Sequence, residues 1–322
     1  MDKVILLADR NSKAWDFAEK IRKYIQDKKE VSIPLEEVSI KHFPNKEIDM
    51  CVPENIRKKD IYFIHDSTKD SQKWWVELLL LKDLLLSASA ESVSFVLPDM
   101  LYSRQDRKDK PHVPISARTL ARSISHDLKR IITMDLHAPQ IQGFYPEDLP
   151  LDNLYSFPEV VRYLKENKTI KNLEELVIVS PDTGGVDRAK AFAQRLKSKY
   201  SVSFIYKQRE NMGKRKIEEM IFVGDVANKD CFIIDDMIDS GGTLCKAAKL
   251  LKEHGARKLF CYGTHGLFTK GTEEIREYFE KVLTSNTHYQ EREGIEVIDV
   301  SPIFAEAIYR AQKGLSISKL FE

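Results

Sequence analysis

The chain has 322 residues, a length typical of two domains with buried cores, which excludes a small scaffold held together by disulfides. Apolar residues make up 42% and charged residues 31% of the sequence, which excludes a low-complexity or disordered chain. The 51 Lys and Arg nearly balance the 50 Asp and Glu, so the formal charge of +1 argues against nucleic acid or an anionic membrane as a partner.

Short apolar runs alternate with helical stretches along the chain, a pattern typical of an α/β protein with largely parallel sheets. Most of the runs are apolar throughout, as expected for strands covered on both faces. The predicted strands are residues 60–65, 93–97, 130–134, 176–179, 202–206, 231–234, 258–262 and 295–300. The predicted helices are residues 74–87, 115–126, 158–166, 187–199, 243–254, 272–279 and 303–312.

Two stretches interrupt this alternation. A proline-rich, acidic break at residues 146–150 lies near the middle of the chain, and we place the domain boundary there, giving domains 1–149 and 150–322. Residues 207–216 are polar, basic and aperiodic, which predicts a mobile loop.

The N-terminal residues and the cysteines indicate a cytoplasmic protein. The first apolar run is too short for a secretory signal. The apolar-rich stretch 74–90 contains charged residues and cannot cross a bilayer. We expect the four cysteines, which lack C-x-x-C spacing, to be reduced, buried thiols. They are Cys51, Cys231, Cys245 and Cys261.

The strongest chemical signal is the segment 231–243, where an apolar strand leads into carboxylates, a small-residue turn and a helix. Gly241 and Gly242 would let backbone N–H groups approach an anion, and the helix would point its positive end at a phosphate. Asp235 and Asp236 can accept hydrogen bonds from ribose hydroxyls. The alternative is an acidic helix cap, but three carboxylates in five residues before the small-residue turn favour a binding loop.

This segment resembles the phosphoribosyl-binding loop of the type I phosphoribosyltransferase fold, and from about Phe43 onward the chain resembles the ribose-phosphate diphosphokinase family. Four separate stretches match in the family's order. They are residues 102–108, 135–144, 179–189 and 231–243. The resemblance implies two similar phosphoribosyltransferase-like α/β domains, each a largely parallel sheet flanked by helices, with the catalytic site between them.

The resemblance also implies a reaction in which the β,γ-diphosphate of ATP moves to the C1 hydroxyl of ribose 5-phosphate. The products are 5-phosphoribosyl 1-diphosphate, which feeds nucleotide biosynthesis, and AMP. The implied ribose 5-phosphate site is Asp235, Asp236, Asp239, Ser240, Gly241, Gly242 and Thr243. The implied ATP site is Phe43, Asn45, Lys46, Glu47, Arg104 and Gln105. Residues 43–47 would read adenine from a neighbouring subunit, which implies a homo-oligomer, either a dimer or a hexamer.

A metal and two mobile cations complete the implied site. A lone histidine is more often structural than a ligand, but His137 and Asp182 both follow predicted strands, where α/β folds gather ligands. The resemblance makes both of them contacts to Mg²⁺, the implied cofactor, or to its waters. Lys207 and Arg209 would close on the triphosphate as catalytic cations. The alternative for these two is a solvated charge run.

The sequence departs from the family's pattern in three places. Asn45-Lys46 stands where the family usually has Asp-Gly, a difference that bears on the choice of nucleotide. Trp74-Trp75 opens a predicted helix where the family tends to be polar. Residues 108–113 replace the stretch through which phosphate-activated members bind regulatory anions, so the sequence leaves both phosphate activation and ADP inhibition open.

Two other functions compete with this interpretation. A nucleobase phosphoribosyltransferase would share the 235–243 loop, but it would explain neither the Arg104-Gln105 segment nor the other domain. A catalytically silent homologue that regulates the enzyme would be favoured by the loss of His137, Lys207 or Arg209. All three are present.

Overall fold

The computed structural model describes residues 1–168, 170–212, 215–289 and 292–321, with no side chains described between residues 208 and 219. The chain divides into two compact units. Unit 1 comprises Met1–Tyr155, Thr287–Tyr289 and Val300–Glu322, and unit 2 comprises Ser156–Asn286 and Gln290–Asp299. The domain limits 1–149 and 150–322 stay a prediction.

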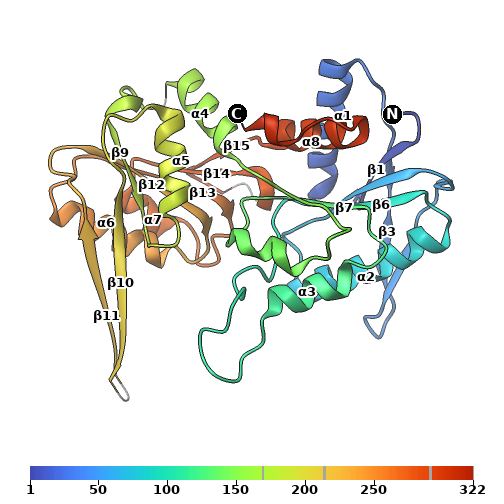
Figure 1. The fold of residues 1–322 in the computed structure, drawn as a ribbon, viewed down its shortest axis with the longest axis horizontal. Coiled ribbons are helices and arrows are strands. Elements are labelled where there is room, and N and C mark those ends of the chain that lie inside the picture. The colour runs from blue at the N-terminus through green and yellow to red at the C-terminus, as the bar shows by residue number, and fades with distance from the viewer. Residues whose placement is uncertain (169, 213–214, 290–291, 322) are drawn as a thin grey trace. The chain divides into compact units, whose positions relative to one another are not determined.

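Unit 1 contains a six-stranded sheet in the order β2-β1-β5-β6-β7-β8, and each neighbouring pair is parallel (Figure 1). The strands are β1 (Val4–Ala8), β2 (Leu35–Glu37), β5 (Asp60–Ile64), β6 (Ser92–Leu97), β7 (Arg130–Met134) and β8 (Leu151–Leu154). Strand β1 is buried along its whole length, so its alternating side chains fill two separate cores. The sheet is therefore covered on both faces, as its apolar strands predict.

Helices pack on both faces of this sheet. Helices α2 (Ser71–Ser87) and α3 (Ser116–Ile124) enclose one core. Helices α1 (Ala14–Lys29) and α8 (Ser301–Lys313) enclose the other. Helix α2 begins before the predicted residue 74 because Asp70 caps it, accepting hydrogen bonds from the backbone N–H groups of Gln72 and Lys73.

Unit 2 contains a seven-stranded sheet in the order β11-β10-β9-β12-β13-β14-β15. The strands are β9 (Leu176–Ser180), β10 (Ser203–Met212), β11 (Arg215–Val223), β12 (Asp230–Ile238), β13 (Leu259–Gly266), β14 (Lys281–Ser285) and β15 (Ile295–Ile298). Helices α4 (Phe157–Asn167) and α5 (Val186–Leu196) cover one face, and α6 (Gly242–Glu253) and α7 (Glu273–Tyr278) cover the other. Every neighbouring pair is parallel except the edge pair β10–β11.

The two sheets follow the same path. The order β2-β1-β5-β6-β7-β8 in unit 1 matches β10-β9-β12-β13-β14-β15 in unit 2, strand for strand. The prediction of two similar, largely parallel α/β halves is therefore confirmed. The match also makes the ends of β1 and β5 equivalent to the ends of β9 and β12.

The predicted loop at residues 207–216 is wrong, because residues 207–212 belong to strand β10 and residues 215–216 to strand β11. Strands β10 and β11 pair antiparallel in one unbroken register from Phe204–Val223 to Met212–Arg215. Only the inner part of β10 pairs with β9, so the hairpin continues beyond the sheet as a two-stranded arm (Figure 1). Pairing between the two strands satisfies those backbone groups of the arm that face the partner strand.

Two further predictions concern the cysteines and the apolar stretch 74–90. All four cysteines are free, as predicted, but Cys51 is exposed on β4 (Ile48–Cys51), so the prediction of burial is wrong for this residue. Within the part of the chain that the structure describes, no helix combines the length and apolar character needed to span a bilayer.

Candidate active site

The carboxyl edge of the unit 2 sheet gathers the predicted sugar-phosphate residues. Asp235 and Asp236 lie near the end of β12, and the turn from Asp239 to Gly241 connects β12 to α6. Asp182 follows the neighbouring strand β9. Ligands of parallel α/β sheets bind at this edge, outside the carboxyl ends of the strands.

Asp235 and Asp236 form a buried acidic pair held by one arginine. Their side chains are 16% and 6% exposed, and Nη1 of Arg188 lies 3.6 Å from Asp235 Oδ1 and 3.1 Å from Asp236 Oδ1. Burial and the Asp236 carboxylate raise the pKa of Asp235 well above its usual range, while Arg188 opposes the rise. Ionised, the pair is a stronger acceptor for the hydrogen bonds of vicinal hydroxyls than it would be when protonated.

The turn after the acidic pair requires glycine at one position. Gly241 has a φ of +78°, and a Cβ there would come within 2.4 Å of Ile275 Cδ1. Gly242 has no comparable restriction, since its Cβ would meet only Ser240 Oγ at 3.7 Å. Helix α6 begins at Gly242, so the N-terminal amides of a helix of 12 residues follow the turn directly. This arrangement suits a phosphate.

Asp182 is fixed by its own turn. The backbone N–H of Gly185 donates to Asp182 Oδ1 at 3.0 Å, and Ser180 Oγ donates to the Asp182 carbonyl at 2.6 Å. The carboxylate is half-buried. A fixed carboxylate at a strand end is a suitable ligand for a hard divalent cation.

His137 belongs to the corresponding edge of unit 1. It follows β7 and is exposed. The chain reaches it through Asp135, whose φ is +41° and whose backbone N–H donates to the Leu154 carbonyl at 2.9 Å. Asn153 Oδ1 accepts from the Leu136 N–H at 3.0 Å. Strand β8 therefore holds the turn that presents the imidazole.

The predicted nucleotide residues of unit 1 lie on two exposed segments. Arg104 and Gln105 are in the loop that joins β6 to α3, and Ser116 Oγ donates to Gln105 Oε1 at 2.5 Å. The backbone N–H of Ala117 also donates to the Gln105 carbonyl at 3.2 Å. The amino end of α3 thus fixes Gln105 beside the exposed Arg104.

The other predicted nucleotide residues form the tip of a small hairpin between β3 (Ser39–His42) and β4. Phe43 donates its N–H to the Glu47 carbonyl at 2.9 Å, and Lys46 donates to the Phe43 carbonyl at 2.8 Å. Asn45 Oδ1 accepts from the Glu47 N–H at 3.2 Å. The Phe43 ring is 50% exposed, so it is not the core residue that an isolated phenylalanine usually is.

Lys207 and Arg209 lie on β10, in the arm of unit 2. Lys207 is partly buried and is paired in register with Met220 of β11. Arg209 is paired with Glu218, but its side chain lies outside the described residues. The structure therefore places both cations on a strand rather than at the start of a loop.

Arg188 is the site residue that the sequence reasoning did not assign. It is the third residue of α5 and belongs to the matched stretch 179–189. The sequence signal that could have identified Arg188 is a cation placed just after a glycine turn, at the start of a helix. Its role depends on the side-by-side pairing of β9 and β12, which spacing along the chain does not reveal.

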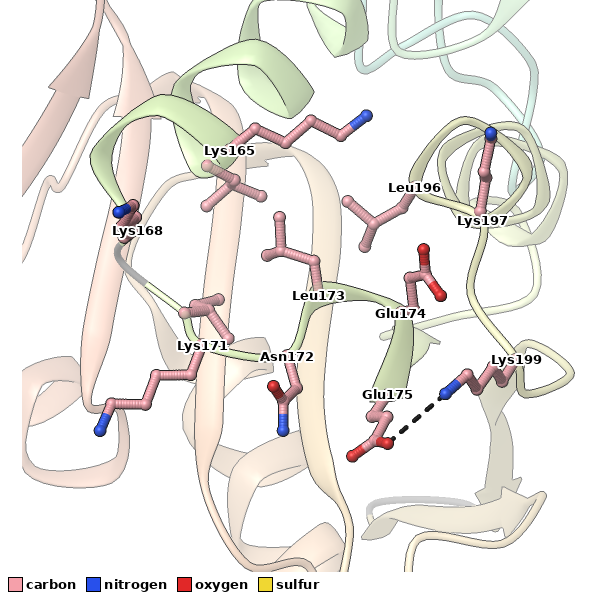
Figure 2. A pocket seen from close by; sticks show the side chains of 12 residues that line it. Lys165, Lys168, Lys171, Asn172, Leu173, Glu174, Glu175, Leu196, Lys197 and Lys199 are labelled. Carbon is pink, nitrogen blue, oxygen red and sulfur yellow. Dashed lines mark ion pairs between the residues drawn. The ribbon is translucent and has the colours of Figure 1, made fainter.

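A separate cavity of about 640 Å³ opens at the other end of the unit 2 sheet, where β9 begins. Figure 2 shows lysines from the end of α4 and the end of α5 around it, with Lys199 paired to Glu175 at 3.5 Å. Lysines are common at helix C-termini, where they balance the helix dipole. None of the predicted site residues lines this cavity.

Comparison with known proteins identifies the family. The N-terminal domain of ribose phosphate pyrophosphokinase matches residues 6–126, and the phosphoribosyl synthetase-associated domain matches residues 201–322. A ribose-phosphate pyrophosphokinase of Rhizobium meliloti (strain 1021) is 38% identical over 302 residues, covering 91% of this chain and 94% of the relative. Ribose-phosphate pyrophosphokinase 4 of Saccharomyces cerevisiae is 37% identical, covering 92% of this chain and 90% of the relative.

A solved structure gives the same result for the fold. The crystal structure of phosphoribosylpyrophosphate synthetase from Mycobacterium smegmatis superposes with a TM-score of 0.83 at 29% identity, covering 97% of this chain and 99% of that one. The agreement in sequence and fold extends over nearly the whole length of both proteins. The chain therefore belongs to the ribose-phosphate pyrophosphokinase family of enzymes.

Proposed function

We propose that the protein transfers the β,γ-diphosphate of ATP to the C1 hydroxyl of ribose 5-phosphate, producing 5-phosphoribosyl 1-diphosphate and AMP. The observation that carries this proposal is the carboxyl edge of unit 2, where an ionisable acidic pair precedes a glycine turn and a helix N-terminus. Such an edge can hold a sugar and its phosphate together. Membership of the family supplies the reaction class.

The sugar phosphate would be held by the 235–243 segment. Asp235 and Asp236 would accept hydrogen bonds from the two ribose hydroxyls, and the amides after Gly241 would bind the 5-phosphate. Ser240 and Thr243 add hydroxyl donors. Asp239 is already engaged by Thr269 Oγ1 at 2.7 Å, so its part would be to fix the turn. Two anchored ends would leave the C1 hydroxyl as the free nucleophile.

The cations of the arm would act on the transferring group. As the C1 oxygen attacks, negative charge moves toward the departing AMP oxygen, and a cation placed there stabilises the transition state more than bound ATP. Lys207, in the arm part of β10, and Arg209, two residues further along the strand, are the cations proposed for this role. The C1 hydroxyl must lose its proton during attack, and the described contacts assign no base to that step.

The residues present fit a divalent cation with few protein ligands. Within the described ranges, no three His, Cys, Asp or Glu side chains gather as a metal site. Mg²⁺ commonly binds through one or two protein groups plus substrate phosphates and water, which suits Asp182 and His137. When bound, Mg²⁺ would neutralise charge on the triphosphate. The three buried thiols, Cys231, Cys245 and Cys261, support a reducing, cytoplasmic setting.

We propose that residues 43–47 of a neighbouring subunit bind adenine, which requires a homo-oligomer, either a dimer or a hexamer. Phe43 is half exposed, and its ring and the polar tip beside it offer a stacking surface. Arg104 would fork onto a phosphate, and Gln105 would face the nucleoside. Phe43→Ala should raise the ATP KM more than the ribose 5-phosphate KM, and a fully active monomer would contradict the shared site.

The decisive experiment for the reaction is an AMP-release assay with ATP, Mg²⁺ and ribose 5-phosphate. We expect AMP and 5-phosphoribosyl 1-diphosphate in equal amounts, with neither formed when the metal is chelated. Equal AMP release with and without the sugar would refute the transfer. Consumption of 5-phosphoribosyl 1-diphosphate when a nucleobase is supplied would instead indicate a phosphoribosyltransferase, and no turnover would indicate a silent homologue.

A further inference from the structure

Arg188 is placed to control the shape and charge of the sugar site from a different strand-to-helix turn. Its side chain is only 14% exposed, and one guanidinium nitrogen faces both Asp235 and Asp236. Neighbouring residues of a strand normally point to opposite faces of the sheet. Here both carboxylates reach the same cation, so the arginine defines where the two acceptors lie relative to each other.

The turn that precedes Arg188 is closely packed. Arg188 lies in the first turn of α5, directly after the glycine turn that follows Asp182. A Cβ on Gly185 would come within 3.8 Å of Arg188 Nη1 and within 2.7 Å of Ser180 Oγ. The turn is therefore closely packed against Ser180, and the absence of a side chain at Gly185 leaves the start of α5 close to the Ser180–Asp182 turn.

The chemistry of the pair calls for a permanent cation. Two carboxylates this close, in a site with little water, favour binding a proton or moving apart. An arginine remains charged at any ordinary pH and donates in a rigid fork, so it can compensate both at once. The backbone N–H of Asp236 donates to Asp235 Oδ1 at 2.9 Å, which also restrains the Asp235 carboxylate. The acidic pair is thus pre-formed before the sugar arrives.

We infer that Arg188 is a positioning residue for ribose 5-phosphate: it acts through Asp235 and Asp236, holding both as fixed, ionised acceptors for the ribose hydroxyls. The inference rests on the proposed function in taking the sugar phosphate as the ligand. It differs from a purely structural ion pair because it predicts a selective loss of sugar affinity. ATP binding, assigned to residues of unit 1, should be nearly unaffected.

The test compares Arg188→Ala, Arg188→Lys and Arg195→Ala, the last a matched control from the final turn of the same helix. Ribose 5-phosphate binding is measured by calorimetry without ATP, and both KM values are measured by AMP release. Arg188→Ala should weaken ribose 5-phosphate binding roughly 10- to 100-fold, the scale of one hydrogen bond to a charged group, and change the ATP KM less than about twofold. Arg188→Lys should recover part of the loss, and Arg195→Ala should match the wild type.

Several outcomes would overturn the inference. Unchanged sugar affinity in a folded Arg188→Ala protein, or equal losses for sugar and ATP, would reduce Arg188 to a structural ion pair. If Arg188→Ala does not fold, wild-type sugar affinity in Arg188→Lys leads to the same conclusion. Binding does not require turnover, so a wild type that binds the sugar but releases no AMP refutes only the proposed function. A wild type that does not bind ribose 5-phosphate refutes both.

Discussion

The two units have the same strand order but treat the same edge of the sheet differently. In unit 1, Asp9 follows β1, and Lys69 Nζ lies 3.0 Å from Asp9 Oδ2 and 2.8 Å from Glu77 Oε2. In unit 2, Asp182 follows the equivalent strand β9, and an arginine holds two carboxylates beside a glycine turn. Unit 1 fills this part of its edge with its own ion pairs, whereas unit 2 keeps acceptors that a sugar can use.

His65 makes the unit 1 arrangement more rigid. It follows β5 and is fully buried. Its ring stacks on Trp74 with ring centroids 5.6 Å apart, and its Nε2 lies 3.1 Å from the carbonyl oxygen of Trp74. The same contacts explain the two tryptophans at the start of α2, since Trp74 is core and Trp75 Nε1 donates to Ser123 Oγ at 2.8 Å. The same strand order thus supports a carboxyl edge held by internal contacts in unit 1 and a proposed binding site at the carboxyl edge of unit 2.

The largest effect is expected for Lys69→Met, which removes the cation of the ion pairs at the carboxyl edge of the unit 1 sheet. Burial alone would lower the pKa of Lys69, but Glu77 and Asp9 together raise it, so the ammonium stays charged. Removing it leaves buried carboxylates uncompensated, and we expect unfolding in urea to become easier by about 3–5 kcal/mol. Lys73→Met, at an exposed position of α2, is the control. A change below about 1 kcal/mol would show that the edge is not held by this cation.

The arm of unit 2 should affect catalysis rather than folding. We expect Lys207→Ala to lower kcat by roughly 100-fold or more, the scale of losing one preorganised charge contact in a transition state. The Tm and ribose 5-phosphate affinity should stay close to wild type. Lys165→Ala, an exposed lysine at the other end of the sheet, is the control. Near-normal kcat would remove Lys207 from the proposed mechanism.

Substitutions of Gly241 and Gly242 test the glycine turn between β12 and α6, which has no counterpart after β5 in unit 1. Gly241→Ala should destabilise the protein by about 2 kcal/mol, because a left-handed φ alone costs roughly 1–2 kcal/mol and the new Cβ would clash with Ile275. Gly242→Ala should change unfolding by less than about 0.5 kcal/mol. Urea unfolding of both variants measures the difference. Equal effects would mean that the turn relaxes and its conformation is not specified by Gly241.

The smallest expected effect is the pH response of His65. Burial lowers the pKa of His65 to about 3, from an ordinary value near 6.5. Between these values the unfolded chain binds a proton that the folded chain does not, so the unfolding free energy falls as the pH is lowered. From about pH 6.5 to pH 5 the loss should be about 1.5 kcal/mol, and His65→Gln should lack it. Parallel pH profiles of the two proteins would contradict a buried neutral imidazole.

The apolar runs predicted strands such as β5, β7 and β12, which are buried on both faces, and every described α-helix except α1. The apolar runs did not lead us to predict β1 and β14, although both strands are largely buried. The apolar pattern did not place strands β3 and β4, whose residues are partly or fully exposed, and the hairpin at residues 43–47 was implied only by the family resemblance. The arm was misread because polar residues paired across a ribbon leave no apolar periodicity. Arg188 was not assigned, since its partners are about fifty residues away along the chain and are neighbours only in the sheet.

Helix α8 completes unit 1 although all of unit 2 precedes it in the chain. Its Phe304 meets Phe17 of α1 edge to face, with ring centroids 5.3 Å apart. During synthesis, α1 leaves the ribosome long before the helix that covers its apolar face. The first unit therefore cannot finish folding until the second has been made, and a nascent chain paused within unit 2 is the species most exposed to aggregation.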